Sequence, residues 1–278
     1  MVSSPRTPDA SSGLSSRVPA LPDGMPQLVD ARPLGGGDVG EVWHGTLADG
    51  REVVIKRGPG DAELEAEGLE ALRTAGASTP AVLGHVDDVI VLEHVAEPGA
   101  PERLGRELAT VHGTTGPAFG WHRDNLIGPL PQSNRWTEAW PTFLAEQRLL
   151  PHVDALPAEL SRRLRAAVED GRLTAVADHD VDPSLVHGDL WAGNVLADRW
   201  LIDPAVHHAD AEVDLAMLDL FGSVSPAMRR GYESVRPLDE GWERRRPLLQ
   251  LPPLLVHVRL FGAGYLGGVA SRLDALDW

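Results

Sequence analysis

One segment of this sequence sets polar side chains at fixed distances along two short apolar runs. Residues 185–204 have the sequence LVHGDLWAGNVLADRWLIDP. Asp189 and Asn194 are separated by four residues, and Asp203 follows at the end of the second apolar run. A carboxylate can orient and deprotonate a hydroxyl, and carboxylate and amide oxygens are ligands for Mg²⁺. The spacing therefore predicts Asp189 as a catalytic base, and Asn194 and Asp203 as metal ligands.

The two apolar runs also predict a tight β-hairpin. Val195–Ala197 and Trp200–Ile202 are joined by a two-residue turn. Because the ends of a hairpin lie side by side, Asn194 at its start and Asp203 at its end are expected to reach one ion. The combined pattern is that of a kinase catalytic loop and the metal-binding aspartate that follows it. It indicates a transfer of phosphoryl groups, with Asn194 among the catalytic residues.

Lys56 is the single lysine of the chain, and all other basic residues are arginine. Arginine is a planar fork, whereas lysine carries a compact charge on a flexible stem, so a lone lysine suggests a position that requires a compact ammonium. Lys56 follows Glu52–Ile55, a β-branched run that predicts a strand. The position is similar to that of the kinase strand lysine, which contacts the α- and β-phosphates of ATP.

A glycine-rich turn precedes the lysine strand. Glycine allows the backbone to approach phosphates closely and to expose its amides as donors. No Gly-Lys-Ser/Thr triplet follows, so the turn is not a Walker A sequence. A strand at 41–46 is expected next, which gives a phosphate-covering hairpin that leads to Lys56. The nucleotide-binding glycines of this turn are Gly35, Gly36, Gly37 and Gly40.

Residues 61–73 predict an amphipathic helix, because leucines and alanines recur at helical spacing. In kinases a glutamate on such a helix pairs with the strand lysine. Glu65 is the preferred partner of Lys56 by analogy with phosphotransferase helices, and Glu67 remains an alternative. The glutamate that does not pair is expected to be a solvated helix charge.

Several blocks of this sequence resemble the fructosamine kinase (ketosamine-3-kinase) family, in the aminoglycoside-phosphotransferase-like branch of the protein-kinase-like fold. HGD followed by ID would indicate the broad superfamily alone. The tryptophan after HGDL and the blocks around 119–128 and 143–151 are more specific. The resembling blocks are EAEGLEAL (65–72), FGWHRDNLIG (119–128), FLAEQRLLP (143–151), HGDLWAGNVL (187–196), IDPAV (202–206), EVDLAMLDLFG (212–222) and LFGAGYLG (260–267).

The resemblance implies an α+β, bilobal protein-kinase-like fold, with a small β-rich lobe that carries one main helix and a larger, mainly helical lobe. It implies ATP- and Mg²⁺-dependent phosphorylation of the sugar-derived C3 hydroxyl of a ketoamine of the fructosamine or ribulosamine type. Such an activity serves protein deglycation and implies a cytoplasmic location. Trp191 would stack on the sugar or the amine substituent of the substrate, and Glu93 and Val95 would offer backbone groups to adenine. Several relatives carry a phosphate-loop cysteine linked to redox control, but this chain has no cysteine, which excludes a disulfide switch.

Two other functions stay open. An aminoglycoside- or choline-like kinase would offer a cluster of acidic groups to a polycation, whereas the W-x-R-D-N block and Trp191 favour a ketoamine. A pseudokinase would bind nucleotide without turnover, and the intact set of Lys56, Asp189, Asn194 and Asp203 argues against it.

The composition limits the possible partners. A formal net charge of −16 argues against nucleic acid or an anionic membrane as a partner. No stretch approaches the ~18 apolar residues of a membrane span, and no apolar signal core is present. The positive groups that ATP needs must therefore be local. The oligomeric state stays open, and a monomer is compatible with the sequence.

The sequence predicts a flexible tail over residues 1–26, an N-terminal lobe over 27–97 and a C-terminal lobe over 98–278. The tail is expected because serine, proline and polar residues dominate its composition. A strand is expected over 89–95 in the first lobe, running into the linker. Helices of the second lobe are expected at 101–111, 136–149, 158–177, 213–221 and 247–273.

Two further groups of polar residues need an interpretation. Asp214 is expected to brace the catalytic loop through hydrogen bonds, and His187 to fix the backbone of that loop. His207, His208 and Asp210 resemble a metal cluster, but adjacent histidines on a strand point in opposite directions. We therefore do not expect a metal site there.

Overall fold

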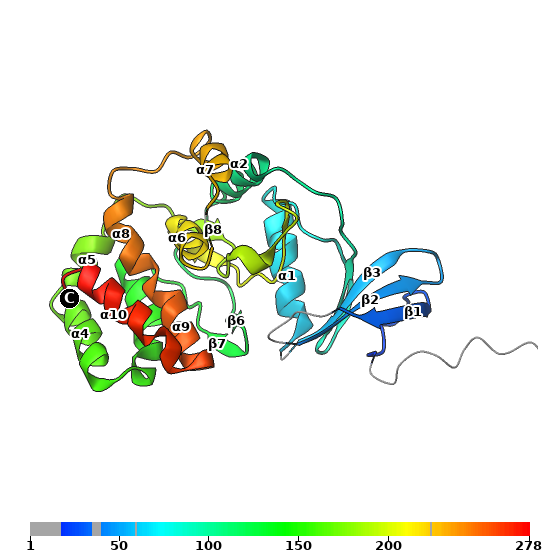
Figure 1. Cartoon of the computed structure of the whole chain (residues 1–278), viewed down its shortest axis with the longest axis horizontal. Coiled ribbons are helices and arrows are strands. Elements are labelled where there is room, and N and C mark those ends of the chain that lie inside the picture. The colour runs from blue at the N-terminus through cyan, green and yellow to red at the C-terminus, as the bar shows by residue number, and fades with distance from the viewer. Residues whose placement is uncertain (1–17, 35–39, 59, 223) are drawn as a thin grey trace, which may run out of the picture. The chain divides into compact units, whose positions relative to one another are not determined.

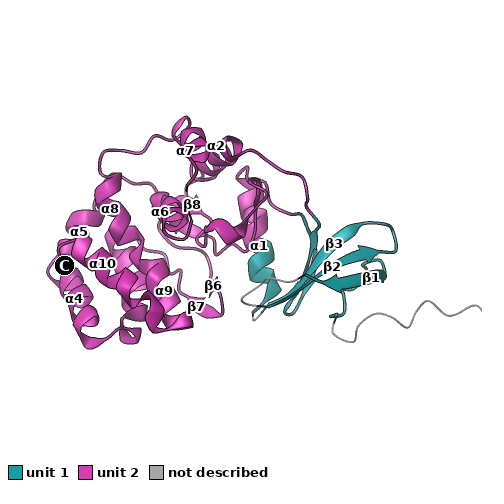
Figure 2. Cartoon of the chain, in the orientation of Figure 1, with its two compact units in different colours: residues 1–66, 81–94 teal, residues 67–80, 95–278 magenta. Residues whose placement is uncertain are grey.

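The structure is a computed structural model, and the ranges that it describes are 18–34, 40–58, 60–222 and 224–278. The chain forms two compact units, drawn in teal and magenta in Figure 2. The first comprises residues up to 66 together with 81–94, and the second comprises residues 67–80 together with 95–278. The expected boundary lay at Glu97, with all of 27–97 in the first lobe. Residues 67–80 instead join the second unit, because Leu72 and Ala77 are part of its hydrophobic core.

Among its described residues, the first unit is built on an antiparallel sheet of five strands in the order β1-β2-β3-β5-β4, of which β1, β2 and β3 are labelled in Figure 1. Alternate residues of the strands point to one face and form its core, among them Trp43, Val53, Ile55 and Val91. The β-branched runs that predicted the strands supply this buried face. The strands are β1 (Leu28–Pro33), β2 (Glu41–Leu47), β3 (Glu52–Arg57), β4 (Val82–Val86) and β5 (Val89–Glu93).

Part of the expected flexible tail belongs to this unit. Residues 1–17 lie outside the described residues, as do Gly35, Gly36 and Gly37 of the glycine-rich turn. From residue 18 on, however, Val18, Leu21 and Met25 pack against the core of the sheet. The prediction of a tail over 18–26 is therefore wrong, because the polar average of the segment concealed three apolar side chains at positions that reach the sheet.

Helix α1 (Ala62–Thr74) follows β3 and agrees closely with the expected helix at 61–73. Glu63 and Glu65 lie in its first turn and Arg73 lies in its last turn, where each sign of charge suits the helix dipole. The second half of α1 packs closely on the chain around Pro204. A Cβ atom added at Gly68 would come within 2.8 Å of the Pro204 side chain, so glycine is what permits this approach.

The second unit is mainly helical and contains three small antiparallel sheets of two strands each. One large core of leucine, valine and aromatic side chains runs through it. The paired strands are β6 (Asn125–Ile127) with β7 (Leu130–Gln132), β8 (Ser184–Val186) with β11 (His207–Ala209), and β9 (Val195–Leu196) with β10 (Trp200–Leu201). The helices are α2 (Pro101–Val111), α3 (Trp140–Phe143), α4 (Ala158–Glu169), α5 (Arg172–Ala177), α6 (Glu212–Leu220), α7 (Pro226–Glu233), α8 (Trp242–Leu249), α9 (Leu251–Phe261) and α10 (Leu266–Ala275), with the π-helix η1 (Leu144–Leu149) and the 3₁₀ turns η2 (Leu150–Ala155), η3 (Ala192–Asn194) and η4 (Ala263–Tyr265).

Helix α2 has the expected bounds, and α6 lies within one residue of them at each end. Three expected elements differ. The helix at 158–177 is broken at Gly171, whose φ of 82° no helix interior adopts. The helix at 247–273 is in fact α8, α9 and α10, because Pro252 lies in the first turn of α9 and Gly262 has a φ of 83°. The helix at 136–149 starts at Trp140 and continues as a π-helix.

The strand at 89–95 also ends early, at Glu93. The chain thus consists of a β-rich unit and a larger helical unit, which confirms the predicted α+β, bilobal architecture.

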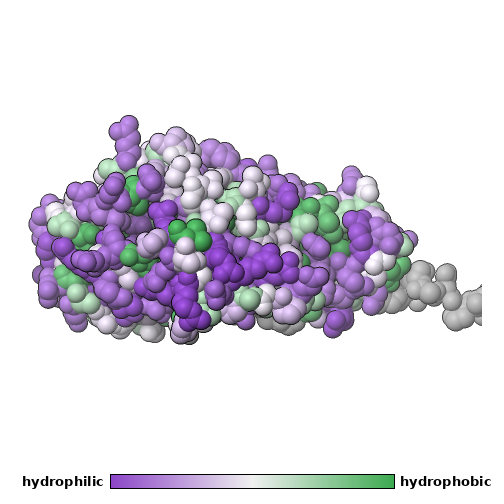
Figure 3. Space-filling view, turned by 90° about the horizontal axis from the view of Figure 1, so that it is seen from above, coloured by the Kyte–Doolittle hydropathy of each residue, from purple (hydrophilic) through white to green (hydrophobic). Residues whose placement is uncertain are grey.

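On the face shown in Figure 3, hydrophilic residues cover most of the surface and hydrophobic residues form small separate patches. Within the described ranges, no helix combines the length and the apolar character needed to cross a membrane.

Candidate active site

The loop that follows strand β8 is held in place by Asp214, a buried carboxylate on α6. Asp214 is 1% exposed and accepts hydrogen bonds from the backbone N–H groups of His187, at 2.7 Å, and of Gly188, at 2.9 Å. The His112 side chain places Nε2 3.1 Å from the same carboxylate. Burial by itself raises the pKa of Asp214, but the hydrogen bond with His112 and the surrounding donors outweigh it and lower the pKa. Asp214 therefore stays ionised and fixes the loop backbone.

His187 connects this loop to the segment that precedes Asp203. Its Nε2 lies 2.9 Å from the carbonyl oxygen of Ile202, so Nε2 carries the proton and donates it. Its Nδ1 then accepts the backbone N–H of Asp189 at 3.2 Å. Burial lowers the pKa of His187, which keeps the ring neutral with this one arrangement of its proton. The ring therefore fixes the backbone of the loop, and its two nitrogens are both used in doing so.

Gly188 is required at its position by geometry. Its φ is 80°, and an added Cβ would lie 2.2 Å from the carbonyl oxygen of Ala205. A side chain at this residue would push apart the two segments that carry Asp189 and Asp203.

Asp189 and Asn194 are in direct contact. The Asn194 side-chain amide donates to the backbone oxygen of Asp189 at 2.8 Å and to its Oδ2 at 3.2 Å. Asn194 is 5% exposed, and Asp189 is half-buried. Because the amide nitrogen of Asn194 is used by Asp189, the atom of Asn194 that could bind a cation is Oδ1. The carboxylate of Asp189 is thus oriented by the same residue that offers an oxygen ligand.

The hairpin predicted between Asn194 and Asp203 is present, with shorter strands than expected. Val195 pairs with Leu201 and Leu196 pairs with Trp200. The turn residues Ala197 and Asp198 have φ values of 52° and 53°, as a type I′ turn requires. At the open end, the Ile202 N–H donates to the Asn194 carbonyl oxygen at 3.1 Å. This bond ties the residue before Asp203 to Asn194, and Asp203 itself has a left-handed φ of 55°.

In the first unit, Lys56 lies in β3 between Val42 of β2 and Ile90 of β5. Its Nζ donates to Glu65 Oε2 on α1 at 2.9 Å. The two side chains are 16% and 18% exposed. The sheet and α1 together therefore hold an ammonium group in a shielded ion pair.

Comparisons with known proteins assign the chain to a family. Residues 20–276 match the model of a family described as fructosamine kinase. The chain belongs to the fructosamine kinase family. It is 34% identical to a probable ketoamine kinase of Enterococcus faecium over 263 residues, which cover 88% of this chain and 92% of that relative. It is 40% identical over 174 residues to a probable ketoamine kinase of Synechocystis, covering 59% of this chain and 57% of that relative.

A solved crystal structure supports the same family assignment. The crystal structure of a candidate fructosamine-3-kinase from Thermobifida fusca matches with a TM-score of 0.81 and 37% identity, covering 90% of this chain and 94% of that one. The predicted protein-kinase-like α+β fold is thereby confirmed, and membership of the fructosamine kinase family makes the chain an enzyme of the phosphotransferase class.

The Trp-His-Arg block of this fructosamine kinase family member has a structural role that the sequence did not reveal. Glu67 on α1 accepts the Trp121 indole N–H at 2.6 Å and Arg123 Nη1 at 3.2 Å, and His122 Nε2 lies 3.2 Å from it. We had attributed the block to substrate preference and expected one of Glu65 and Glu67 to be a solvated charge. Glu67 instead anchors α1 to the loop that contains Trp121 and Arg123.

Replacing Glu67 by alanine should lower the free energy of unfolding by about 1–3 kcal/mol, because Trp121 and Arg123 would each lose a hydrogen-bond acceptor. Denaturant unfolding measures the effect. Glu70→Ala on the same helix is the matched control, because Glu70 forms an exposed pair with Arg73 that solvent screens and that should contribute little to stability. Equal losses for the two variants would contradict the anchoring role of Glu67.

The remaining predicted nucleotide and substrate contacts are placed as follows. The Glu93 N–H donates to the Ala81 carbonyl oxygen, and the His94 N–H donates to that of Glu52, so both donors are used within the first unit. Val95, the next residue, is half-buried and belongs to the second unit. Gly40 has a φ of 123°, and an added Cβ would lie 2.6 Å from the Arg57 carbonyl oxygen.

Trp191, the predicted substrate contact, is 38% exposed. Its indole lies over Gly193, where an added Cβ would come within 2.3 Å of the ring. The ring therefore packs on its own loop, while more than a third of its surface is open to solvent. A ligand could stack on this open indole surface, which lies two residues after Asp189 in the sequence.

The adjacent side chains of His207 and His208, which follow the catalytic segment, contact different aromatic rings. His207 stacks on Phe143 with ring centroids 5.8 Å apart, and His208 lies against Trp121 at 5.1 Å. Asp210 instead lies near His179 and Glu212. Arg245 donates to both oxygens of Glu212, so this buried cluster already contains a cation.

Proposed function

We propose that this enzyme is an ATP- and Mg²⁺-dependent kinase that phosphorylates a sugar hydroxyl of ketoamines, a reaction of deglycation repair. The observation that carries the proposal is the loop in which Asn194 orients the Asp189 carboxylate while a hairpin bond holds the chain next to Asp203. The substrate class is supported by the family and by relatives that are named probable ketoamine kinases. Such a reaction requires a compartment that supplies ATP, such as the cytoplasm.

In the proposed reaction, Asp189 binds the acceptor hydroxyl and takes its proton as the oxygen attacks the γ-phosphorus, while the bond from that phosphorus to the β,γ-bridging oxygen breaks and ADP leaves. Asn194 Oδ1 and the carboxylate of Asp203 fit Mg²⁺, because both are hard oxygen donors and the Asn194 nitrogen is turned away to Asp189. The ion, when bound, would neutralise charge on the phosphate oxygens. Lys56, held by Glu65, would contact the nucleotide phosphates. Trp191 would present its open indole surface to the acceptor.

Local positive charge matters more in this chain than in most, since its formal net charge is −16. An anionic nucleotide approaches such a protein against its average field. Lys56, the metal ion and backbone amides would have to supply the attraction at close range, where a protein site screens charges less than water does.

A coupled assay for ADP release tests the proposal. The purified chain with Mg·ATP should release ADP in the presence of a fructosamine or ribulosamine and should release far less without an acceptor. Kanamycin and choline serve as the alternative acceptors. Turnover with either of them and none with ketoamines would overturn the substrate assignment, and nucleotide binding without any turnover would identify a pseudokinase.

Lys56 provides an independent chemical test because it is the single lysine. An amine-reactive acyl-phosphate derivative of ATP should label Lys56, and excess Mg·ATP should suppress the labelling. Peptide mapping by mass spectrometry measures both results. Unprotected labelling at saturating nucleotide would place Lys56 away from the phosphates.

Substitution of Lys56 should reduce turnover strongly even when the charge is kept. Lys56→Met removes the ammonium group that Glu65 binds in a shielded position. Lys56→Arg replaces a compact ammonium with a planar fork, so it should also fail to restore turnover. Arg57→Lys on the same strand is the control, because Arg57 is more exposed and its pairs with Glu41 and Asp88 are looser, at 3.4 and 3.8 Å.

A further inference from the structure

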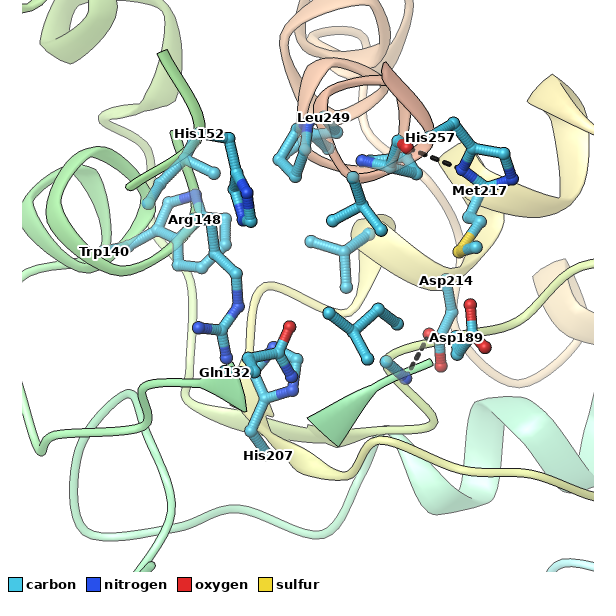
Figure 4. A pocket seen from close by; sticks show the side chains of 17 residues that line it. Gln132, Trp140, Arg148, His152, Asp189, His207, Asp214, Met217, Leu249 and His257 are labelled. Carbon is cyan, nitrogen blue, oxygen red and sulfur yellow. Dashed lines mark hydrogen bonds between the residues drawn. The ribbon is translucent and has the colours of Figure 1, made fainter. Parts of the chain in front are cut away.

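A pocket within the second unit ends at the catalytic loop (Figure 4). The cavity itself has a volume of about 60 Å³, which is enough for a small alkyl group or a few water molecules. Gly188 and Asp189 form part of its wall. The loop that would hold the acceptor hydroxyl is therefore also one wall of a pocket that the proposed chemistry does not use.

The wall of this pocket is largely apolar. Its apolar side chains are mostly buried, and several of them belong to the hydrophobic clusters of the second unit. A sugar ring would leave its hydroxyls without hydrogen-bond partners against such a wall, at a considerable cost in free energy. An alkyl or aryl group would lose nothing there and would gain from leaving water. The main apolar residues are Ile127, Leu144, Met217, Leu249 and Val256.

Both carboxylates of the wall, Asp189 and Asp214, lie at the end of the pocket formed by the catalytic loop. Burial lowers the pKa of His152 to about 4 and lowers the pKa of His257, so both rings are neutral near pH 7. Asp214 is already bound to the catalytic loop. Asp189 and Arg148 lie on opposite sides of the pocket in Figure 4. A ligand that extends from Asp189 into the pocket thus moves away from the carboxylate and towards a cation.

Arg148 is a fixed part of this arrangement. Its guanidinium donates to the Ser133 carbonyl oxygen and to Asn134 Oδ1, both at 2.6 Å, and it lies over the Phe143 ring at 4.5 Å. Among the described residues, no carboxylate forms an ion pair with it within 4.0 Å. Burial lowers the pKa of Arg148 to about 9, and the charge of Asp124 acts against that shift, so the guanidinium stays protonated near pH 7 and would repel a second ammonium group placed in the pocket.

We infer that this pocket binds the amine substituent of the ketoamine and selects an uncharged, apolar one. The inference rests on the proposed ketoamine kinase activity. The sugar hydroxyl would lie at Asp189, and the alkyl or aryl group on the nitrogen would enter between Leu144, Met217 and Val256. Ketoamines of simple apolar amines would then be better substrates than those of diamines or polyamines, whose terminal ammonium would approach Arg148.

Three ketoamines of one sugar test this selection: those of 3-methylbutylamine, methylamine and 1,3-diaminopropane. The 3-methylbutylamine derivative should have a kcat/KM about 10-fold above that of the methylamine derivative, because its alkyl group is removed from water. The diamine derivative has a similar reach but ends in an ammonium, and should fall at least about 10-fold below the 3-methylbutylamine derivative. Values within about twofold for all three would overturn the inference while leaving the kinase activity in place. Absence of turnover with all three would instead refute the proposed function.

Substitution of Val256 locates the effect in the pocket. Val256→Trp should fill the space and bring the ratio of kcat/KM between the 3-methylbutylamine and methylamine derivatives close to one. Val235→Trp makes the same change at a residue that is 50% exposed and should keep the ratio of the native enzyme. If Val256→Trp does not fold, Met217→Ala provides the opposite change. It should favour the larger 2-phenylethylamine derivative by about 10-fold relative to methylamine. An unchanged ratio in either folded pocket variant would exclude this pocket as the binding site.

Discussion

Replacing Asp189 by asparagine should lower kcat by about 100-fold or more while the protein still folds and binds nucleotide. Asparagine has nearly the same shape, and its side-chain oxygen can still accept the bond from Asn194 that Asp189 Oδ2 accepts at 3.2 Å. The amide cannot take a proton from the acceptor hydroxyl, so the loss should appear in kcat and hardly in the affinity for ATP. Steady-state kinetics with a ketoamine, thermal unfolding and calorimetric titration of nucleotide measure the three quantities.

Asp198→Asn is the matched control for this variant. Asp198 lies in the turn of the same hairpin, is exposed, and has a φ of 53°, a conformation that asparagine adopts readily. Its kcat should equal that of the native enzyme. If Asp189→Asn also retained a near-native kcat, Asp189 would not be the base.

Replacing Asp203 by asparagine should abolish turnover and weaken the binding of Mg·ATP by at least about 10-fold, while the affinity for metal-free nucleotide changes little. The reason is the loss of a charged oxygen ligand from the metal. Asparagine is preferable to alanine as the primary variant, because Asp203 has a left-handed φ of 55° that alanine would strain. Asp203→Ala should show the same metal defect together with a loss of stability.

Calorimetry with and without Mg²⁺ separates these effects. The decisive quantity is the ratio of the two nucleotide affinities, which a general distortion of the site would leave unchanged. Equal Mg·ATP affinities for the native protein and for Asp203→Asn would remove Asp203 from the metal site. The Asp198→Asn protein again provides the control, since it carries the same substitution five residues earlier in the hairpin.

The parts of this structure that the sequence predicted well are those encoded locally. The hairpin between Asn194 and Asp203 follows from two apolar runs and a short turn, and the bracing of the loop by Asp214 was expected because its local sequence, EVDLA, resembles that of the bracing aspartate of the superfamily. The preference for Glu65 over Glu67 came from analogy, and the structure has Lys56 donating to Glu65. The catalytic and binding roles of these residues remain predictions until the variants are measured.

The parts that the sequence did not predict depend on distant contacts. Glu67 meets Trp121 and Arg123 across 54 and 56 residues of sequence, and no periodic pattern reports such a contact. The same is true of Val18, Leu21 and Met25, whose apolar side chains matter because a sheet lies beside them. In the C-terminal region, apolar periodicity continued through residues that the backbone geometry separates, so one long helix was expected where three occur.

The network around Asp214 could not be anticipated either. His112 Nδ1 lies 2.9 Å from the Tyr232 hydroxyl, while its Nε2 faces Asp214. Tyr232 lies in α7 and His112 follows α2, and both are distant in sequence from the catalytic segment. The position of the catalytic loop therefore depends on three elements whose contributions become visible when they are folded together.

The shielded pair of Lys56 and Glu65 has a consequence for the chemical durability of the protein. Unprotonated amines attack the carbonyl group of reducing sugars, and lysine side chains are where proteins accumulate this damage. This chain has a single lysine, and its Nζ lies 2.9 Å from a carboxylate with 16% of the side chain exposed. A sugar would have to break that ion pair before it could form a bond to the nitrogen. An enzyme that acts on sugar-modified amines would thus have almost no side-chain amine of its own to be modified, and could persist where its substrates form.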